Sequence, residues 1–376
     1  MGTPIAWLNL KHRKSRTLAA LSGVSMAIIL IFLQLGFYTA AFKSAVMILQ
    51  QFDYDLALVS GDYVYIRQSG SFPKSRLDQA RSVEGVAGVM PLYMGVGLTQ
   101  IPGLDAKREI AILGIDPAQS LWLEDSMSRL ARNLSQLDTV LLDTKVGPGY
   151  DRLRAGLVLE IDNHRVRIAD TFTHGPGFTG SAALLTGDQT YARIFNMPDR
   201  DSISVGLVKT RPGTDVDAIV TKLNAVLPSD VHAFSRIDLE NGEQNWSIKV
   251  KPVGIMFTSG LMLAFVVGAV ILYQILATEI INHLREYATL KAMGSTSLSL
   301  NMLVWKQAIL YSVLGYIPAS IIASMIYMLI DGTTTLPTEM TTGKLFTVFI
   351  IVSIMCVSAG TAAARKVNKA DPAELF

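Results

Sequence analysis

The chain has 376 residues, of which 50% are hydrophobic and 17% are charged, whereas about 25% of the residues of an ordinary soluble domain are charged. The formal net charge is only +2, and no dense run of Lys and Arg with interleaved aromatic residues is present, which argues against a nucleic-acid-binding protein. The single cysteine, Cys356, lies in an apolar run, so a disulfide framework and a cysteine-based metal site are excluded. The composition therefore indicates a protein that resides in lipid.

Four segments contain no charged residue, and each is long enough to cross a bilayer as a helix, which takes about 20 residues. These segments are residues 17–42, 252–278, 307–330 and 345–364. The first is longer than the apolar region of a signal peptide and is followed by no good cleavage site, so we expect it to stay in the protein as a membrane helix. The sequence thus predicts a membrane α-helical protein with four transmembrane helices.

The basic residues next to these segments predict on which side of the membrane each loop lies, because Lys and Arg in short loops favour the cytoplasm. They cluster in residues 1–16, 279–306 and 365–376, whereas residues 331–344 contain one. We therefore expect a cytoplasmic helix over 1–16, a cytoplasmic loop over 279–306 and a cytoplasmic tail over 365–376. Residues 331–344 become a short periplasmic loop, and residues 43–251 a large periplasmic domain of an inner-membrane protein.

The periplasmic segment is predicted to fold as an α+β domain, because candidate strands and helices alternate near both of its ends. We expect strands within 54–66 and over 86–93, 109–115, 202–209 and 231–237, and helices over 75–82 and 215–226. Between these groups, three further candidate strands are separated by turns, over 139–143, 157–161 and 166–171. The pattern predicts a small β-rich subdomain within the domain.

No catalytic, cofactor-binding or metal-binding constellation is recognisable. Residues 175–180 (GPGFTG) match G-x-G-x-x-G, but the proline and the periplasmic location favour a loop over a dinucleotide site. His164 and His174 match no familiar zinc spacing. The chain contains no G-x-x-x-x-G-K-[ST] phosphate loop. We therefore expect a non-catalytic subunit without a cofactor of its own.

Small residues recur at four-residue spacing in three of the apolar segments, a pattern that lets helix backbones approach closely. The candidate packing residues in the first two segments are Ala19, Gly23, Ala27, Gly260, Ala264 and Gly268. Such rows are compatible with packing inside one chain and with a seam between two copies. No charged residue lies within the four segments, which argues against an ion-coupled carrier.

The cytoplasmic loop begins with a predicted short helix that ends near Gly294. Leu284, Tyr287 and Leu290 recur near helical spacing and form an apolar ridge, with Glu286 beside it. Such a ridge could rest on lipid headgroups or dock on a protein partner.

The block EYATLKAMG at 286–294 resembles the coupling motif of the FtsX-like, MacB-type permease subunits of ABC transporters. Further segments resemble the DevC branch of that family, namely AWLNL at 6–10, QLGF at 34–37, Glu243 with Trp246, YQIL at 273–276 and DPAELF at 371–376. The resemblance implies a coupling helix that docks on a separate ATPase. It implies this docking role for His283, Leu284, Arg285, Glu286, Tyr287, Leu290 and Lys291.

The resemblance also implies the partners of the chain. We expect a homodimer with two ABC ATPase subunits that carry ATP and Mg, a periplasmic adaptor and an outer-membrane duct. The machine would export amphiphilic cargo, and the DevC branch implies a glycolipid. Residues 42–54 and 237–251 would extend the first two membrane helices as a stalk toward a porter-like part of the periplasmic domain.

Two alternatives remain open at the level of the sequence. The same mechanical machine could regulate cell-wall hydrolases or release lipoproteins. A membrane sensor is the alternative from another class, since a periplasmic domain flanked by membrane helices is common there.

Overall fold

The computed structural model describes residues 14–101, 106–119, 121–173, 182–197, 201–250, 252–282, 289 and 296–369. The chain divides into two compact units. The helical unit contains residues 1–39, 255–330 and 338–376, and the external unit contains residues 40–254 and 331–337. The predicted residues 175–180 and His174 lie outside the described residues.

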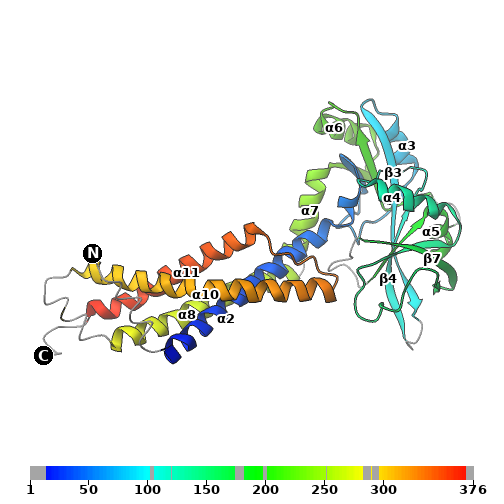
Figure 1. Cartoon of the computed structure of the whole chain (residues 1–376). Helices are drawn as coiled ribbons and strands as arrows, with labels where there is room; N and C mark the ends of the chain where they lie inside the picture. Colours follow the sequence, from blue (N-terminus) through cyan, green and yellow to red (C-terminus); the bar gives the residue numbers. More distant parts are fainter. Residues whose placement is uncertain are drawn as a thin grey trace. The chain divides into compact units, whose positions relative to one another are not determined.

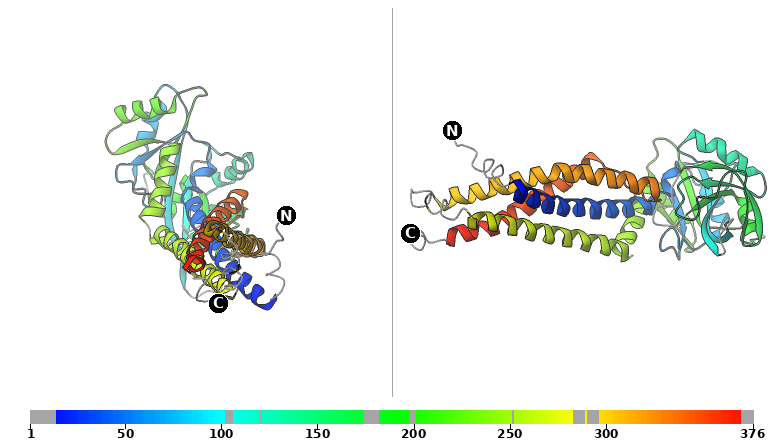
Figure 2. Two further views of the ribbon diagram at one scale, coloured as in Figure 1. Left: turned by 90° about the vertical axis from the view of Figure 1, so that its left-hand side faces the viewer. Right: turned by 60° about the horizontal axis from the view of Figure 1, so that its bottom comes forward.

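Four long helices build the helical unit and run side by side (Figures 1 and 2). They are α2 (Lys14–Val46), α8 (Pro252–Asn282), α10 (Ser297–Thr333) and α11 (Thr342–Lys369). Each contains a segment long and apolar enough to cross a membrane. The prediction of a four-helix membrane part joined to a large α+β domain is confirmed.

The core of the helical unit forms around α2. Val24, Ile28 and Phe32 of this helix are buried against residues of the other three helices. By contrast, α8, α10 and α11 leave large apolar side chains exposed, such as Met262, Met328 and Phe346. Exposed apolar surface of this extent is costly in water but suits the hydrocarbon of a bilayer.

A nine-stranded sheet forms the external unit, in the order β11-β1-β10-β3-β4-β8-β5-β7-β6. Its strands are β1 (Leu56–Ser60), β3 (Val86–Gln100), β4 (Lys107–Ile115), β5 (Thr139–Asp143), β6 (Val158–Ile161), β7 (His164–Phe172), β8 (Ala183–Gly187), β10 (Val205–Thr210) and β11 (Val231–Ser235). A separate two-stranded ladder joins β2 (Phe72–Pro73) to β9 (Ser202–Ile203).

The first part of this sheet is a split βαβ arrangement of the ferredoxin-like type. Helix α3 (Ser75–Arg81) connects β1 to β3, and helix α6 (Val216–Val226) connects β10 to β11. The four strands are all antiparallel to their neighbours. Apolar residues of both helices, such as Leu77 and Leu223, are buried in one core with residues of this sheet face. This part corresponds to the predicted porter-like part.

The second part is the predicted β-rich subdomain, and it grows from the far half of β3. Six strands, from β3 through β4, β8, β5 and β7 to β6, follow one another in the sheet, and Thr99 of β3 pairs again with Ile161 of β6. The strands therefore nearly close a ring. The ring is filled by residues such as Ile112, Val140, Leu159 and Ile168.

The opposite face of the sheet is covered over only part of its length. The covering elements are η1 (Leu49–Gln51), α4 (Asp125–Ala131), η2 (Arg132–Ser135) and α7 (Arg236–Lys249). Helix α5 (Asp188–Ile194) packs on the other side, where Tyr191 and Ile194 join the larger core. The α4, α5 and β8 elements were not expected from the sequence. We had expected residues 237–251 to prolong the second membrane helix as a stalk, but α7 ends at Lys249 and α8 begins at Pro252, so the two are separate helices.

Candidate functional site

The predicted ATPase-docking residues His283, Leu284, Arg285, Glu286, Tyr287, Leu290 and Lys291 lie outside the described residues. On one side, helix α8 ends at Asn282. On the other side, helix α10 begins at Ser297. The docking role of this segment therefore stays a prediction.

The small residues of α2 and α8 lie in contacts within a single chain. A Cβ atom added at Gly268 would lie 3.0 Å from the Cβ atom of Ala27, and one added at Gly260 would lie 2.6 Å from the amide carbon of Gln34. At Gly23, an added Cβ atom would lie 3.2 Å from Ile271 of α8. The glycines thus let the two backbones approach where any larger side chain would collide.

The alanines of the two rows of small residues are described to different extents. Ala27 and Ala264 are buried, with 1% and 5% of their surface exposed. Ala19 lies on α2, but its side chain is not among those described. A seam between two copies of the chain stays a prediction.

Helix α10 packs on α2 in the same manner. A Cβ atom added at Gly315 would lie 3.0 Å from Val24 of α2, and the Ser25 hydroxyl donates a hydrogen bond of 3.0 Å to the Gly315 carbonyl. The Tyr327 hydroxyl donates to the Phe32 carbonyl. These polar contacts fix the rotation of α10 about its axis, because in hydrocarbon a buried hydroxyl needs a partner.

In the external unit, the loop after β1 is held on α7 by one carboxyl group, that of Glu243. This side chain is 2% exposed. It accepts a hydrogen bond of 2.6 Å from the Tyr63 hydroxyl and bonds of 3.0 and 3.1 Å from the Ile66 backbone N–H. Burial and the charge of Glu243 raise the pKa of Tyr63 well above its ordinary value, so the Tyr63 hydroxyl stays protonated and remains a donor.

A ring contact strengthens this attachment. The rings of Tyr65 and Trp246 stack with centroids 3.9 Å apart and planes 11° apart. We refer to Tyr63, Tyr65, Ile66, Glu243 and Trp246 together as the Glu243 clamp. Because Glu243 and Trp246 lie three residues apart, they are on the same face of α7, and the clamp fixes the loop at two points of that face.

A second set of contacts ties the start of α7 to the beginning of β1. The Ser235 hydroxyl caps α7 by accepting a bond of 3.1 Å from the Asp238 N–H. Glu240 accepts bonds of 3.2 Å from the Tyr54 hydroxyl and 2.8 Å from the Arg236 Nε atom. The Arg236 guanidinium also lies over the Tyr54 ring, 4.9 Å from its centroid. Helix α7 is therefore bound to the sheet along its length.

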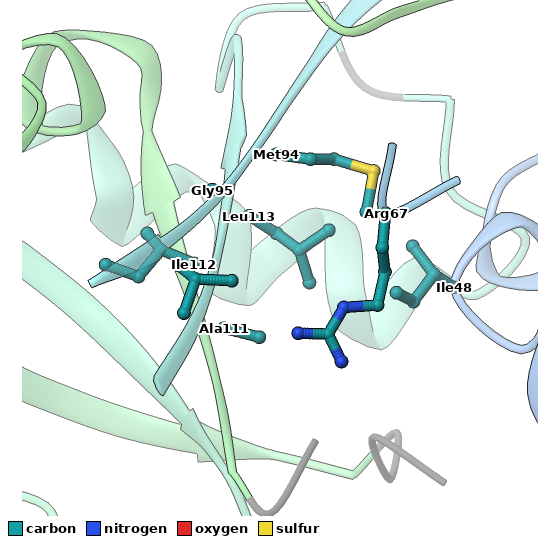
Figure 3. A pocket seen from close by; sticks show the side chains of 8 residues that line it. Ile48, Arg67, Met94, Gly95, Ala111, Ile112 and Leu113 are labelled. Atoms are coloured by element: carbon teal, nitrogen blue, oxygen red, sulfur yellow. The ribbon is translucent and has the colours of Figure 1, made fainter. Parts of the chain in front are cut away.

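A pocket of about 130 Å³ opens on the sheet face beside this loop (Figure 3). It is lined by Ile48, Arg67, Met94, Gly95, Val96, Ala111, Ile112 and Leu113. Among the described residues that line the pocket, Arg67 alone is charged, and it belongs to the loop that the Glu243 clamp holds. The described lining holds no nucleophile, acid or base, and no group of three metal-ligating side chains is found in the part of the chain that the structure describes. An apolar lining with one cation is suited to binding.

This pocket was not predicted from the sequence. Its lining comes from four separate stretches of the chain, and Arg67 stands in a short polar turn without a motif. Glu243 and Trp246 were singled out only through the family resemblance, and the structure now shows what they contact. The role of Glu243 follows from its surroundings in the fold, because a buried carboxylate that faces a loop needs hydrogen-bond donors from that loop.

The comparisons with known proteins concern both units. No curated protein sequence matches the chain. Among solved structures, the chain is similar to the extracellular domain of YknZ, a noncanonical ABC-type transporter from Gram-positive bacteria, at 12% identity and a TM-score of 0.35, over 48% of this chain and 98% of that one. It is also similar to the periplasmic region of MacB from Actinobacillus actinomycetemcomitans, at 12% identity and a TM-score of 0.37, over 52% of this chain and 96% of that one.

A family model gives the match in the helical unit. It covers residues 258–372, a range that includes most of α8, all of α10 and α11, and the loop that carries the predicted docking residues. The matching model is that of the FtsX-like permease C-terminal region.

Proposed function

We propose that this chain is the permease subunit of an ABC-type exporter. The observation that carries the proposal is the match of residues 258–372 to the FtsX-like permease C-terminal region. The match agrees with the resemblance of the EYATLKAMG block, which lies inside the matched range. In this proposal two copies of the chain work with two separate ABC ATPases, which bind ATP and Mg, with the termini in the cytoplasm and the external unit in the periplasm.

Two features that the sequence lacks support the proposal that a separate subunit hydrolyses ATP. The chain has no phosphate loop for ATP, and its four apolar segments contain no charged residue for ion coupling. Energy must therefore come from a partner. The loop 279–306, with Glu286 beside the ridge of Leu284, Tyr287 and Leu290, is the part that we propose receives it.

The external unit supports a mechanical role for α7. This helix ends at Lys249 and α8 begins at Pro252, so two residues connect it covalently to a candidate membrane helix. The Glu243 clamp and the Glu240 contacts hold α7 on the sheet. In our proposal, ATP-driven movement of α8 reaches the sheet by this route, and a periplasmic adaptor and an outer-membrane duct complete the export path for an amphiphilic cargo such as a glycolipid.

Association with the ATPase tests the proposal. We expect the double variant Glu286→Ala with Leu290→Ala to weaken ATPase binding to the permease in nanodiscs by about 2 to 5 kcal/mol, the cost of truncating one member of a buried interfacial charge pair. A solvated loop would lose only about 0 to 1 kcal/mol. Glu84→Ala, which removes an exposed glutamate of the external unit, is the matched control. Wild-type ATPase binding by the double variant would refute the docking role, and ATP hydrolysis by the pure permease would refute the proposed division of labour.

A further inference from the structure

The floor of the pocket is an apolar sheet surface that the covering helices do not reach. Met94 of β3 pairs with Leu113 of β4, and Val96 pairs with Ala111, so these four side chains lie on one face of two adjacent strands. Leu113 is 5% exposed, whereas Val96 is 44% exposed. The cover provided by the neighbouring elements therefore ends between these two pairs, and the pocket lies at that edge.

Arg67 places a positive charge at this edge. Its side chain reaches across the pocket with the guanidinium group directed toward Ala111, between Leu113 and Ile48 (Figure 3). Within the described part of the chain, Arg67 is exposed and forms no ion pair or side-chain hydrogen bond. A guanidinium group presents several N–H donors in a plane that matches the oxygens of a carboxylate or phosphate. The pocket thus joins an apolar surface to one unneutralised cation.

The backbone that carries Arg67 is fixed before any ligand arrives. Ile66, the preceding residue, donates its N–H to Glu243, and the Gln68 N–H donates a bond of 2.8 Å to the Tyr65 carbonyl. The Tyr65 ring is held by its stack on Trp246. A ligand that binds Arg67 therefore does not need to order this loop, which lowers the entropic cost of binding.

The apolar surface continues past the pocket along β3 and ends beside charged residues of β4. Leu98 lies on the same face as Val96, about 7 Å further along the strand, and is 45% exposed. It pairs with the exposed Glu109 of β4. Lys107, which is also exposed, follows Glu109 on the same face of β4. The far end therefore carries charges of both signs, whereas the pocket end carries the Arg67 cation, which favours binding of the anionic group of an elongated ligand at Arg67.

We propose that this pocket binds an amphipathic anion, namely an acyl chain that carries a carboxylate or phosphate group. The anionic group contacts Arg67, and the first carbons of the chain fill the space between Val96, Ala111 and Leu113. A volume of about 130 Å³ is well below the roughly 300 to 1,000 Å³ of a pocket that encloses a whole drug-sized ligand. Only the anionic end and its nearest methylenes are enclosed, and the remaining chain follows Leu98. That this ligand is the cargo rests on the proposed function, whereas its binding does not.

Photocrosslinking on the full chain in nanodiscs of zwitterionic lipid tests the site. The probe is dodecanoate with a photoreactive group on its chain, and the labelled peptides are identified by mass spectrometry. We expect saturable labelling of the peptides that contain β3 and β4. Arg67→Gln should raise the half-saturating concentration about tenfold, because a hydrogen bond to a charged group is lost. Arg211→Gln, which removes an exposed Arg in a turn of the same unit, should leave it unchanged.

Competition experiments distinguish the contribution of the anionic group to binding from that of the acyl chain. Unlabelled dodecanoate and dodecyl phosphate should displace the probe, dodecanol should do so at least about tenfold less well, and inorganic phosphate should not displace it. Ala111→Leu fills the pocket and should reduce labelling, while the thermal unfolding midpoint shows that each variant is folded. Competition by lysophosphatidate as well as by dodecanoate would show that single-chain anions in general bind, whereas no competition by lysophosphatidate would restrict the site to anions with a small head, such as dodecanoate and dodecyl phosphate.

Three results with the variant and the competitors would overturn the proposal. They are unchanged labelling in Arg67→Gln, equal competition by dodecanol and dodecanoate, and competition by inorganic phosphate alone. Labelling confined to peptides other than those of β3 and β4 would do the same. Because no ATPase is present, a negative result here leaves the proposed permease function untouched, and failure of ATPase docking leaves this site untouched.

Discussion

Removal of the Glu243 carboxyl group should release the loop that carries Arg67. In Glu243→Ala, the Tyr63 hydroxyl and the Ile66 N–H both lose their acceptor. A buried donor without a partner costs about 1 to 3 kcal/mol, so two donors cost about 2 to 6 kcal/mol. The same substitution relieves the desolvation of the carboxyl group itself, which places the expected net loss in the lower part of that range, at about 2 to 3 kcal/mol.

Hydrogen exchange of the full chain measures this loss where it occurs. The amide of Ile66 donates directly to Glu243, so it reports the opening of the clamp. A loss of about 2 to 3 kcal/mol accelerates its exchange by about 30- to 150-fold when opening and closing are fast. Tyr63→Phe removes one donor and leaves the bond from Ile66, so we expect a smaller loss of about 1 kcal/mol.

The double variant and a matched control complete the test. If Glu243 and Tyr63 act through their common bond, the losses of Glu243→Ala and Tyr63→Phe will not add, because the second change removes a donor that the first has already left unpaired. Glu84→Ala changes an exposed glutamate of the same unit and should leave the exchange at Ile66 unaltered. Exchange at Ile66 in Glu243→Ala within about threefold of the wild-type rate, a change of less than 1 kcal/mol, would refute the clamp.

Two further predictions concern packing and pH. In Gly268→Leu, even the Cβ atom of the new side chain would lie 3.0 Å from Ala27, so the detergent-solubilised protein should lose about 1 to 3 kcal/mol of stability. Gly332→Leu, where an added Cβ atom meets nothing within 4 Å, should cause no such loss. Equal unfolding midpoints of the two variants would contradict the close contact at Gly268. Burial alone would raise the pKa of Asp55, but hydrogen bonds from the Thr210 N–H and hydroxyl, with those of a neighbouring lysine, lower this pKa below its ordinary value. Since the pKa of Asp55 is lower in the folded than in the unfolded protein, the ionised carboxylate stabilises the fold above about pH 4, and this stabilisation is lost as the pH falls through the folded pKa. In acid, the amide protection of β1 in the wild type should therefore approach that in Asp55→Asn. A difference in protection between the two proteins that does not change with pH would count against this linkage.

Strand and helix positions followed from the sequence wherever a local pattern set them. The strand at Thr139–Asp143 is a buried apolar run between turns, and its observed bounds equal the predicted ones. Helix α6 begins after Asp215, whose side chain accepts from the Asp217 N–H. In such cases the local preference and the tertiary packing favour the same structure.

Elements that depend on distant contacts were missed or cut short. The strand predicted over 86–93 continues to Gln100 through Gly95 and Gly97, residues that normally weaken a strand. Both glycines are needed for packing, since an added Cβ atom would lie 2.5 Å from Phe195 at Gly95 and 2.6 Å from Ile161 at Gly97. These neighbours lie far along the chain, so no local window contains the reason for the extension.

The same limit explains why the candidate binding site could not be predicted. Its cation, Arg67, and its floor at Val96 and Ala111 are brought together by the pairing of β3 with β4 and by the hold of Glu243 on the loop. The predicted docking residues are the opposite case, because they form one continuous block that a family resemblance can mark. A site whose residues are brought together by the topology can be predicted only from the fold, whereas a site formed by a continuous motif can be predicted from the sequence.

The location of Arg67 has a thermodynamic consequence for the proposed exporter. A ligand at Arg67 can influence α7 only if it binds one position of the loop more tightly than another, and the loop is joined to α7 through Glu243 and Trp246. If ATP-driven movement of α8 shifts α7, binding coupling must be reciprocal: the ligand changes ATPase affinity by the same factor by which ATPase binding changes ligand affinity, commonly about 5- to 150-fold. Breaking the clamp with Glu243→Ala should bring both factors toward one while each partner still binds. A ligand effect on ATPase affinity that survives this change would place the route of coupling outside α7.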